Sequence, residues 1–231
     1  ISKTIKDINQ LSLTFPVPSL TEHYQSKPDR YITNILGHEG PGSLHAYLNE
    51  KGWIESLGAG SQSFDKNTSL IVINIAMTNQ GAEKTDQIIG AVFQYINFLR
   101  EQPLSESLYD EQAALADLEF QFVESASPMG VVYSLAPKLS ETIAEDLLVA
   151  PYLMNEFQPK KIKEYLNLLT QKNVLVEINS MTAKTTDTEQ WFEVPYKLQL
   201  GEITISRVED FTPLLPTTNP FIPEELALVP R

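Results

Sequence analysis

The sequence contains no cysteine, which excludes disulfide bonds, thiol catalysis and zinc held by cysteine. It also has no apolar run near the roughly 20 residues that cross a bilayer, so we expect a soluble protein without a membrane partner. Basic residues are scarce, 17 against 30 acidic ones, and the net charge of -13 disfavours nucleic acid as a partner. At 231 residues and 42% apolar content, the chain can bury a sizeable core.

Histidine is scarce as well, and of the three histidines only His38 and His45, with Glu39, resemble a zinc site. Helical zinc hydrolases place two histidines four residues apart, so that both imidazoles project from one face. Here the spacing is seven, and residues 40–42, Gly-Pro-Gly, disfavour a continuous helix between them. We therefore expect exposed or capping histidines and no metal. A hydrolase that uses these three residues is the least favoured alternative.

Other catalytic motifs are also missing. No Gly-x-Ser-x-Gly elbow is present, because Gly42-Ser43-Leu44 lacks the second glycine. The glycines after Leu36 lack the lysine of a phosphate-binding loop. We therefore predict no catalytic residue in this chain.

A glycine-rich stretch, residues 31–60, holds six of the ten glycines. Such a cluster indicates tight turns, or a backbone that another molecule approaches closely. We expect Gly37, Gly58 and Gly60 to lie at strand ends, where free amide and carbonyl groups pair with an extended peptide. Glu39 can accept a hydrogen bond from a ligand amine. The alternative, that these glycines serve only helix ends and turns, stays open.

Hydrophobic periodicity predicts strands separated by pairs of helices. The expected strands are residues 8–17, 53–57, 69–77 and 173–179, with an extended segment at 191–200; the expected helices are 28–37, 43–52, 81–101, 105–124, a stretch after 128 and 160–169. This pattern indicates an α+β fold, with a mostly antiparallel mixed sheet and helices packed on one face. Four prolines within residues 210–223 predict an extended linker.

Five motifs, in this order, resemble the second domain of the M16 family of zinc metallopeptidases, the pitrilysin and insulin-degrading enzyme group. They are Leu13-Thr-Phe-Pro-Val-Pro, Gly37-His-Glu-Gly-Pro-Gly-Ser-Leu, Lys51-Gly-Trp, Phe93-Gln-Tyr-Ile and Asn219-Pro-Phe-Ile-Pro. The resemblance spans about residues 5–223. It implies a fold of the LuxS/MPP-like metallohydrolase type, one of four similar domains that close around a peptide.

The resemblance also implies a role. In this family the His-x-x-Glu-His zinc motif lies in the first domain, so the cofactor zinc belongs to the parent enzyme and this chain is a non-catalytic neighbour. The second domain is associated with an exosite that anchors the N-terminal end of the substrate. The matching positions are Asn34, Gly37, Glu39, Leu57, Ala59 and Ser61. Asn34, Ala59 and Ser61 depart from the usual residues, which leaves the sequence preference of the exosite open.

We divide the chain into an M16-type domain (1–209), an interdomain linker (210–227) and a probable tag remnant (228–231). The expected partners are peptide substrates and the other domains of the parent chain, and self-association is left open. Bacterial relatives of this kind indicate a periplasmic parent enzyme. The alternative function is a structural or assembly domain without peptide binding.

Overall fold

The computed structural model describes residues 1–124, 126–201, 203 and 205–222. Its strands are β1 (Ser2–Lys3), β2 (Asn9–Pro18), β3 (Ile54–Ser63), β4 (Thr68–Met77), β5 (Leu175–Ser180), β6 (Asp187–Thr188) and β7 (Pro195–Tyr196). Its α-helices are α1 (Pro28–Leu36), α2 (Leu44–Glu50), α3 (Asn79–Ala82), α4 (Thr85–Glu101), α5 (Glu106–Gln121), α6 (Pro128–Leu135) and α7 (Pro159–Leu168). Short 3₁₀ helices are η1 (Thr21–His23), η2 (Ala136–Ser140) and η3 (Ala144–Asp146).

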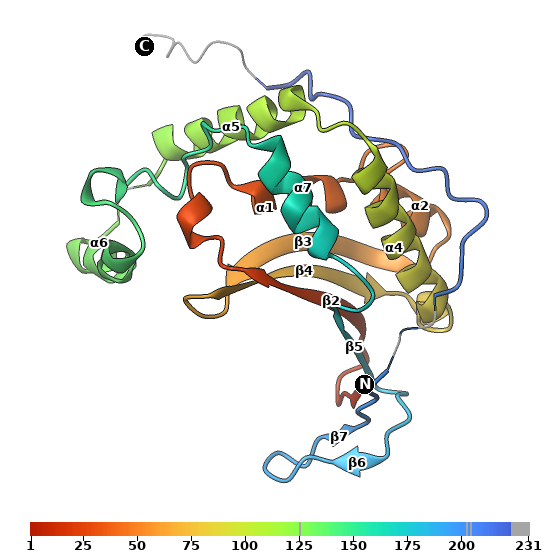
Figure 1. The fold of residues 1–231 in the computed structure, drawn as a ribbon. Helices are drawn as coiled ribbons and strands as arrows, with labels where there is room; N and C mark the ends of the chain where they lie inside the picture. The colour runs from red at the N-terminus through yellow and green to blue at the C-terminus, as the bar shows by residue number, and fades with distance from the viewer. Residues whose placement is uncertain (125, 202, 204, 223–231) are drawn as a thin grey trace, which may run out of the picture.

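The strands form one sheet in the order β3-β4-β2-β5-β1-β7-β6, and the helices lie over one of its faces (Figure 1). Every neighbouring pair is antiparallel except β1 with β5, which is parallel. The predicted α+β fold, with a mostly antiparallel mixed sheet and helices on one face, is confirmed.

The two central strands explain why the sheet forms. In β2 and β4 every second side chain is apolar and buried, and Leu13 lies opposite Ile73 in the paired register. This alternation sends one face of each strand into the helical layer, where each large apolar side chain contributes about 1.5–3 kcal/mol. The expected strand 8–17 is β2, which contains Pro16 and ends at Pro18. Both prolines lie beyond the last pair with β5, Thr14 with Leu175, so their missing N–H groups break no ladder on that side.

Strand β3 is longer than the predicted segment 53–57 and reaches Ser63. The turn to β4 therefore shrinks to four residues, and the Asp65 carboxylate accepts hydrogen bonds from the Asn67 and Thr68 N–H groups at 2.7 and 2.9 Å. Gly58 and Gly60 consequently lie inside a strand rather than at strand ends, which corrects our expectation. Pairing with β4 supplies the regular structure that these glycines do not favour by themselves.

The proline-rich segment after residue 209 is extended, as expected, but its first part packs on the domain. Phe211 is 5% exposed and stacks on Tyr47 with ring centroids 4.5 Å apart. The Gln94 side chain of α4 donates to the Phe211 carbonyl at 3.1 Å. The division at residue 209 stays a prediction, and residues 223–231, with the proposed tag remnant, lie outside the described residues.

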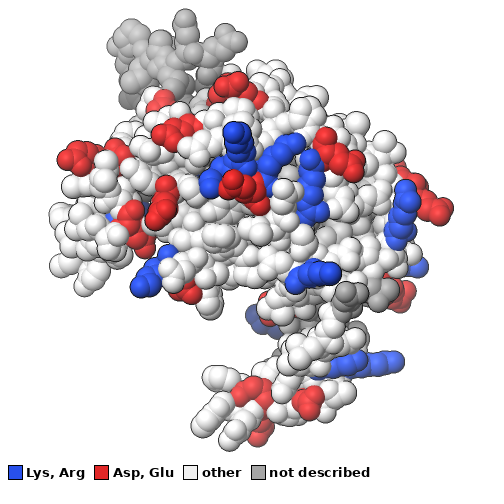
Figure 2. Space-filling model, viewed as in Figure 1, with Lys and Arg blue, Asp and Glu red and all other residues white. Residues whose placement is uncertain are grey.

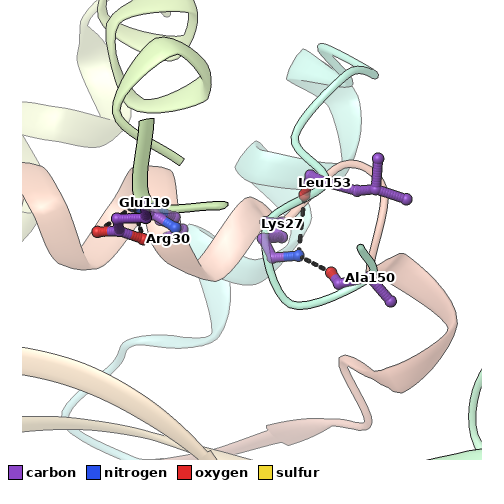
Figure 3. A network of polar contacts seen from close by, with 5 residues as sticks. All are labelled: Lys27, Arg30, Glu119, Ala150 and Leu153. Atoms are coloured by element: carbon purple, nitrogen blue, oxygen red, sulfur yellow. Dashed lines mark hydrogen bonds and ion pairs between the residues drawn. The ribbon is translucent and has the colours of Figure 1, made fainter. Parts of the chain in front are cut away.

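Residues 128–154 are here called the α6 arm: helix α6 projects away from the sheet and its helices (Figure 1), and the arm returns to the body at Ala150 and Met154, which are buried. Helix α6 buries none of its side chains, and Phe122, which lies in the expected helix 105–124 but just after α5, is 64% exposed. The end of the arm is tied to the body by Lys27, whose ammonium donates to the Ala150 and Leu153 carbonyls at 2.6 and 2.8 Å (Figure 3). Burial lowers the pKa of Lys27 to about 8.

Candidate peptide-binding edge

Helix α1 sets one wall of the site. Pro28 occupies its first turn, and its buried residues include Ile32, Ile35 and Leu36, which hold the helix against the body of the domain. The helix ends at Gly37, whose N–H donates to the Thr33 carbonyl at 2.9 Å. The end of α1 is thereby fixed in position.

Gly37 lies directly beside β3. A Cβ atom built on Gly37 would stand 3.3 Å from the Ala59 nitrogen and 3.8 Å from the Ala59 Cβ. The structure thus brings together two residues that are 22 positions apart and that the sequence placed in one site. A side chain at position 37 would press on the strand, so the helix end or the strand would have to move by a few tenths of an ångström.

Strand β3 is the outermost strand on its side of the sheet, so one of its edges has no partner strand among the described residues. Leu57, Ala59 and Ser61 are alternate residues of this strand, and their side chains therefore share one face. Leu57 is buried in the core, Ala59 is half-buried, and the Ser61 hydroxyl donates to the Asp29 carboxylate at the start of α1. This face packs against α1, whereas Gly58 and Gly60 are exposed.

The loop after α1 carries Glu39. Its side chain is exposed, and the described part of the chain gives it no ion pair or side-chain hydrogen bond. One hydrogen bond within the loop runs from the Gly40 N–H to His38 Nδ1 at 2.9 Å. A second comes from the segment after residue 209, where the Leu214 N–H donates to the Gly42 carbonyl at 3.0 Å. Asn34 lies on α1, half-buried, one turn before Gly37. The six predicted residues therefore surround the junction of α1 and β3, with Leu57 inside the core.

The histidines do not form a metal centre. No group of three or more histidine, aspartate or glutamate side chains within the described ranges could hold a metal ion. His38 uses Nδ1 to accept from the backbone, and His45 has a buried Nδ1 for which the described residues provide no hydrogen-bond partner. The hydrolase alternative built on His38, Glu39 and His45 has no geometric support.

On the face in view, acidic and basic side chains are interspersed over the helices rather than gathered into a field of one sign (Figure 2). Within the described ranges no helix has both the length and the apolar character needed to cross a membrane. The features that distinguish the edge are geometric: an outermost strand, a helix end against it, and an exposed carboxylate nearby.

Sequence reasoning missed two parts of this region. Asp29, which holds Ser61, gave no signal in the sequence because its partner is 32 residues away and the contact depends on how α1 crosses β3. The length of β3 was also underestimated, since the alternation of apolar residues stops after Leu57 while the pairing with β4 continues. The longer strand is defined by its pairing with β4. That pairing depends on residues outside the segment and could not be recognised from the segment's own sequence.

Two family models match the chain. The "Peptidase M16 inactive domain" matches residues 1–115, and the "Middle or third domain of peptidase_M16" matches residues 120–231. The insulin-degrading enzyme of Homo sapiens is 35% identical over 98% of this chain, and the A-factor-processing enzyme of Saccharomyces cerevisiae is 30% identical over 85%. The crystal structure of pitrilysin is 25% identical, covers 97% of this chain and superposes with a TM-score of 0.87.

These relatives are much longer than this chain, which spans 23% of the human enzyme, 19% of the yeast enzyme and 25% of the pitrilysin chain. The two family models together match almost the whole of it, and one of them describes an inactive domain. The motifs and the fold agree with this match. The chain therefore belongs to the M16 peptidase family.

Proposed function

We propose that this chain is a non-catalytic part of an M16-type zinc metalloendopeptidase, which helps to enclose peptide substrates and anchors their N-terminal end. The observation that carries the proposal is the outermost position of β3, with the end of α1 packed against it at Gly37 and Ala59. An extended peptide can add to such an edge as a further strand. The chemistry would take place in another domain of the parent chain, where its zinc would be bound.

The anchoring residues are Asn34, Gly37, Glu39, Leu57, Ala59 and Ser61, as the family resemblance implies. Main-chain groups of β3 would pair with the peptide, and the exposed Glu39 would accept a charge-assisted hydrogen bond from the peptide amino group. Gly58 and Gly60 support this, since no atom lies within 4 Å of a Cβ built on either. Binding energy gained here, away from the scissile bond, would hold the substrate in register for hydrolysis.

The other domains of the parent chain would complete the enclosure, and the parent enzyme would be periplasmic. Self-association of this chain is a separate question that its molar mass in solution would answer.

The test compares peptides with free and acetylated amino ends. We expect the wild type to bind the free form about tenfold more tightly, a difference of about 1.4 kcal/mol. Glu39→Gln should abolish that preference, because the amide carries no charge for the ammonium group. Glu50→Gln, an exposed glutamate on α2, is the matched control and should retain it. Equal affinity for both peptides in the wild type would contradict the amine anchor.

A structural role without peptide binding is the second candidate. It is favoured by exposed apolar side chains on the α6 arm, which suit contact with another domain; they include Met129, Val132, Tyr133, Leu139 and Leu148. In the same titration, such a domain would show no dependence on peptide or on Glu39.

A further inference from the structure

Two cavities open just beyond Ser61, where β3 approaches its turn. The smaller, about 300 Å³, is lined by Ser61, Gln62 and Ser63 together with Asp29 and Lys138. The larger, about 830 Å³, lies between the β3–β4 turn, η1 and α7. Three residues line both cavities: Thr21, His23 and Glu141. The two cavities therefore adjoin each other at these residues, and together they are called the groove here; it begins at Ser61, the last residue of the proposed peptide edge.

The inner walls of the groove are built from packed elements. His23 of η1 contacts the Tyr165 ring of α7 edge-on, with ring centroids 5.9 Å apart, and the Tyr165 hydroxyl donates to the Ser19 carbonyl at 3.1 Å. Burial and the nearby Lys161 lower the pKa of His23, so the imidazole is uncharged at neutral pH. The rings of His23 and Tyr165 therefore form an ordered aromatic surface on this side of the groove.

The outer wall comes from the α6 arm. Lys138, Glu141 and Thr142 line the smaller cavity on this side. Lys27 fixes the end of the arm to the start of α1 through its bonds to Ala150 and Leu153 (Figure 3). The groove therefore lies between two parts of the molecule that are held together, rather than beside a free segment.

The groove carries both charges in equal number. The four carboxylates that line it are Glu22, Asp29, Glu141 and Glu164, and the four lysines are Lys27, Lys66, Lys138 and Lys161. Several of these charged side chains already have partners in the protein. Asp29 accepts a hydrogen bond from Ser61, Lys27 donates to main-chain carbonyls, and Lys161 forms an ion pair with Glu164 at 2.7 Å. No strong field of one sign remains, so the groove should select a ligand by its extended shape and length rather than by its charge.

We propose that this groove is a second subsite for the peptide: a chain anchored by its amino end on β3 continues past Ser61 and lays its following residues between η1, α7 and the α6 arm. The inference rests on the proposed function. It assigns the substrate class as extended peptides of either charge that are longer than the stretch paired with residues 57–61. At about 3.3 Å per residue, roughly five peptide residues cover that stretch, and later residues enter the groove.

The test uses two uncharged, polar peptides with the same free amino end, five and twelve residues long, titrated into this chain. We expect the twelve-residue peptide to bind about tenfold more tightly, which corresponds to about 1.4 kcal/mol. Glu141→Trp places a large ring where the two cavities adjoin, on an exposed residue whose side chain forms no ion pair within the described residues. It should remove the gain from length and leave the five-residue peptide unaffected. Glu145→Trp, exposed on the same arm but outside the groove, should behave as the wild type.

A second variant, Lys66→Trp, narrows the groove from the β3–β4 turn and should have the same effect as Glu141→Trp. Circular dichroism checks that each variant is folded. Equal affinity for the two peptides, or a length gain that survives both variants, would overturn the groove while leaving the edge intact. Loss of binding for both peptides in the wild type would overturn the edge and the groove together.

Discussion

Gly37 and Ala59 meet where the end of α1 crosses the edge strand, and the space between them is tight: a Cβ on Gly37 would lie 3.3 Å from the Ala59 nitrogen. The φ angle of Gly37 is -92°, a conformation that any residue adopts. The neighbouring strand, and not the backbone angles of the helix end, is therefore what favours glycine here.

This contact predicts a contrast between two glycines of the site. Gly37→Ala should shift α1 from β3, destabilise the domain by about 1 kcal/mol and weaken peptide binding. Gly60→Ala should change stability by less than about 0.5 kcal/mol, because no atom lies within 4 Å of the new Cβ. Urea unfolding and peptide titration of both variants measure the contrast. Equal effects of the two substitutions would show that the helix–strand contact is not responsible.

The packed segment after residue 209 predicts a contrast between two phenylalanines. Phe211→Ala should cost about 3 kcal/mol, because it removes a buried ring stacked on Tyr47. Phe221→Ala, at a position that is 89% exposed, should be nearly neutral. Urea unfolding monitored by circular dichroism compares them. If Phe211→Ala were also neutral, the segment would be a linker from residue 210 onward.

Asp210 predicts a dependence of stability on acidity. Hydrogen bonds from Lys51 and then from Tyr47, at 2.9 Å for the latter, lower the pKa of this carboxyl below its ordinary value of 3.8. Because the folded-state pKa lies below the unfolded one, the contribution is complete above about pH 5 and is lost as the pH falls through the folded-state pKa.

Asp210→Asn should therefore be less stable than the wild type at pH 7, and the difference should close between pH 5 and pH 2. Glu209→Gln, the exposed neighbouring carboxylate, is the control. Thermal unfolding over this pH range measures both. A difference that stays constant with pH would mean that the carboxylate charge has no part in holding the segment.

Some elements could be predicted from the sequence because their signals are local. The 3.6-residue period of α4 and the alternation in β2 and β4 arise from residues that all face one core, so the pattern can be read along the chain. Phe122 shows the limit: its position continues the pattern of α5, yet the helix ends at Gln121 and the ring is exposed. A periodic pattern shows which face of a helix is apolar. It does not show where the helix ends or whether another element covers that face.

The sequence by itself determined the α+β class, the main helices and strands and the family, because periodicity and ordered motifs are properties of neighbouring residues. Only the tertiary structure decided that β3 is the outermost strand, that Gly37 touches Ala59, that Phe211 is buried and that a groove opens beyond Ser61. Each of these depends on contacts between residues far apart in the chain. Such contacts are set by how strands pair and helices pack, and no local pattern records them.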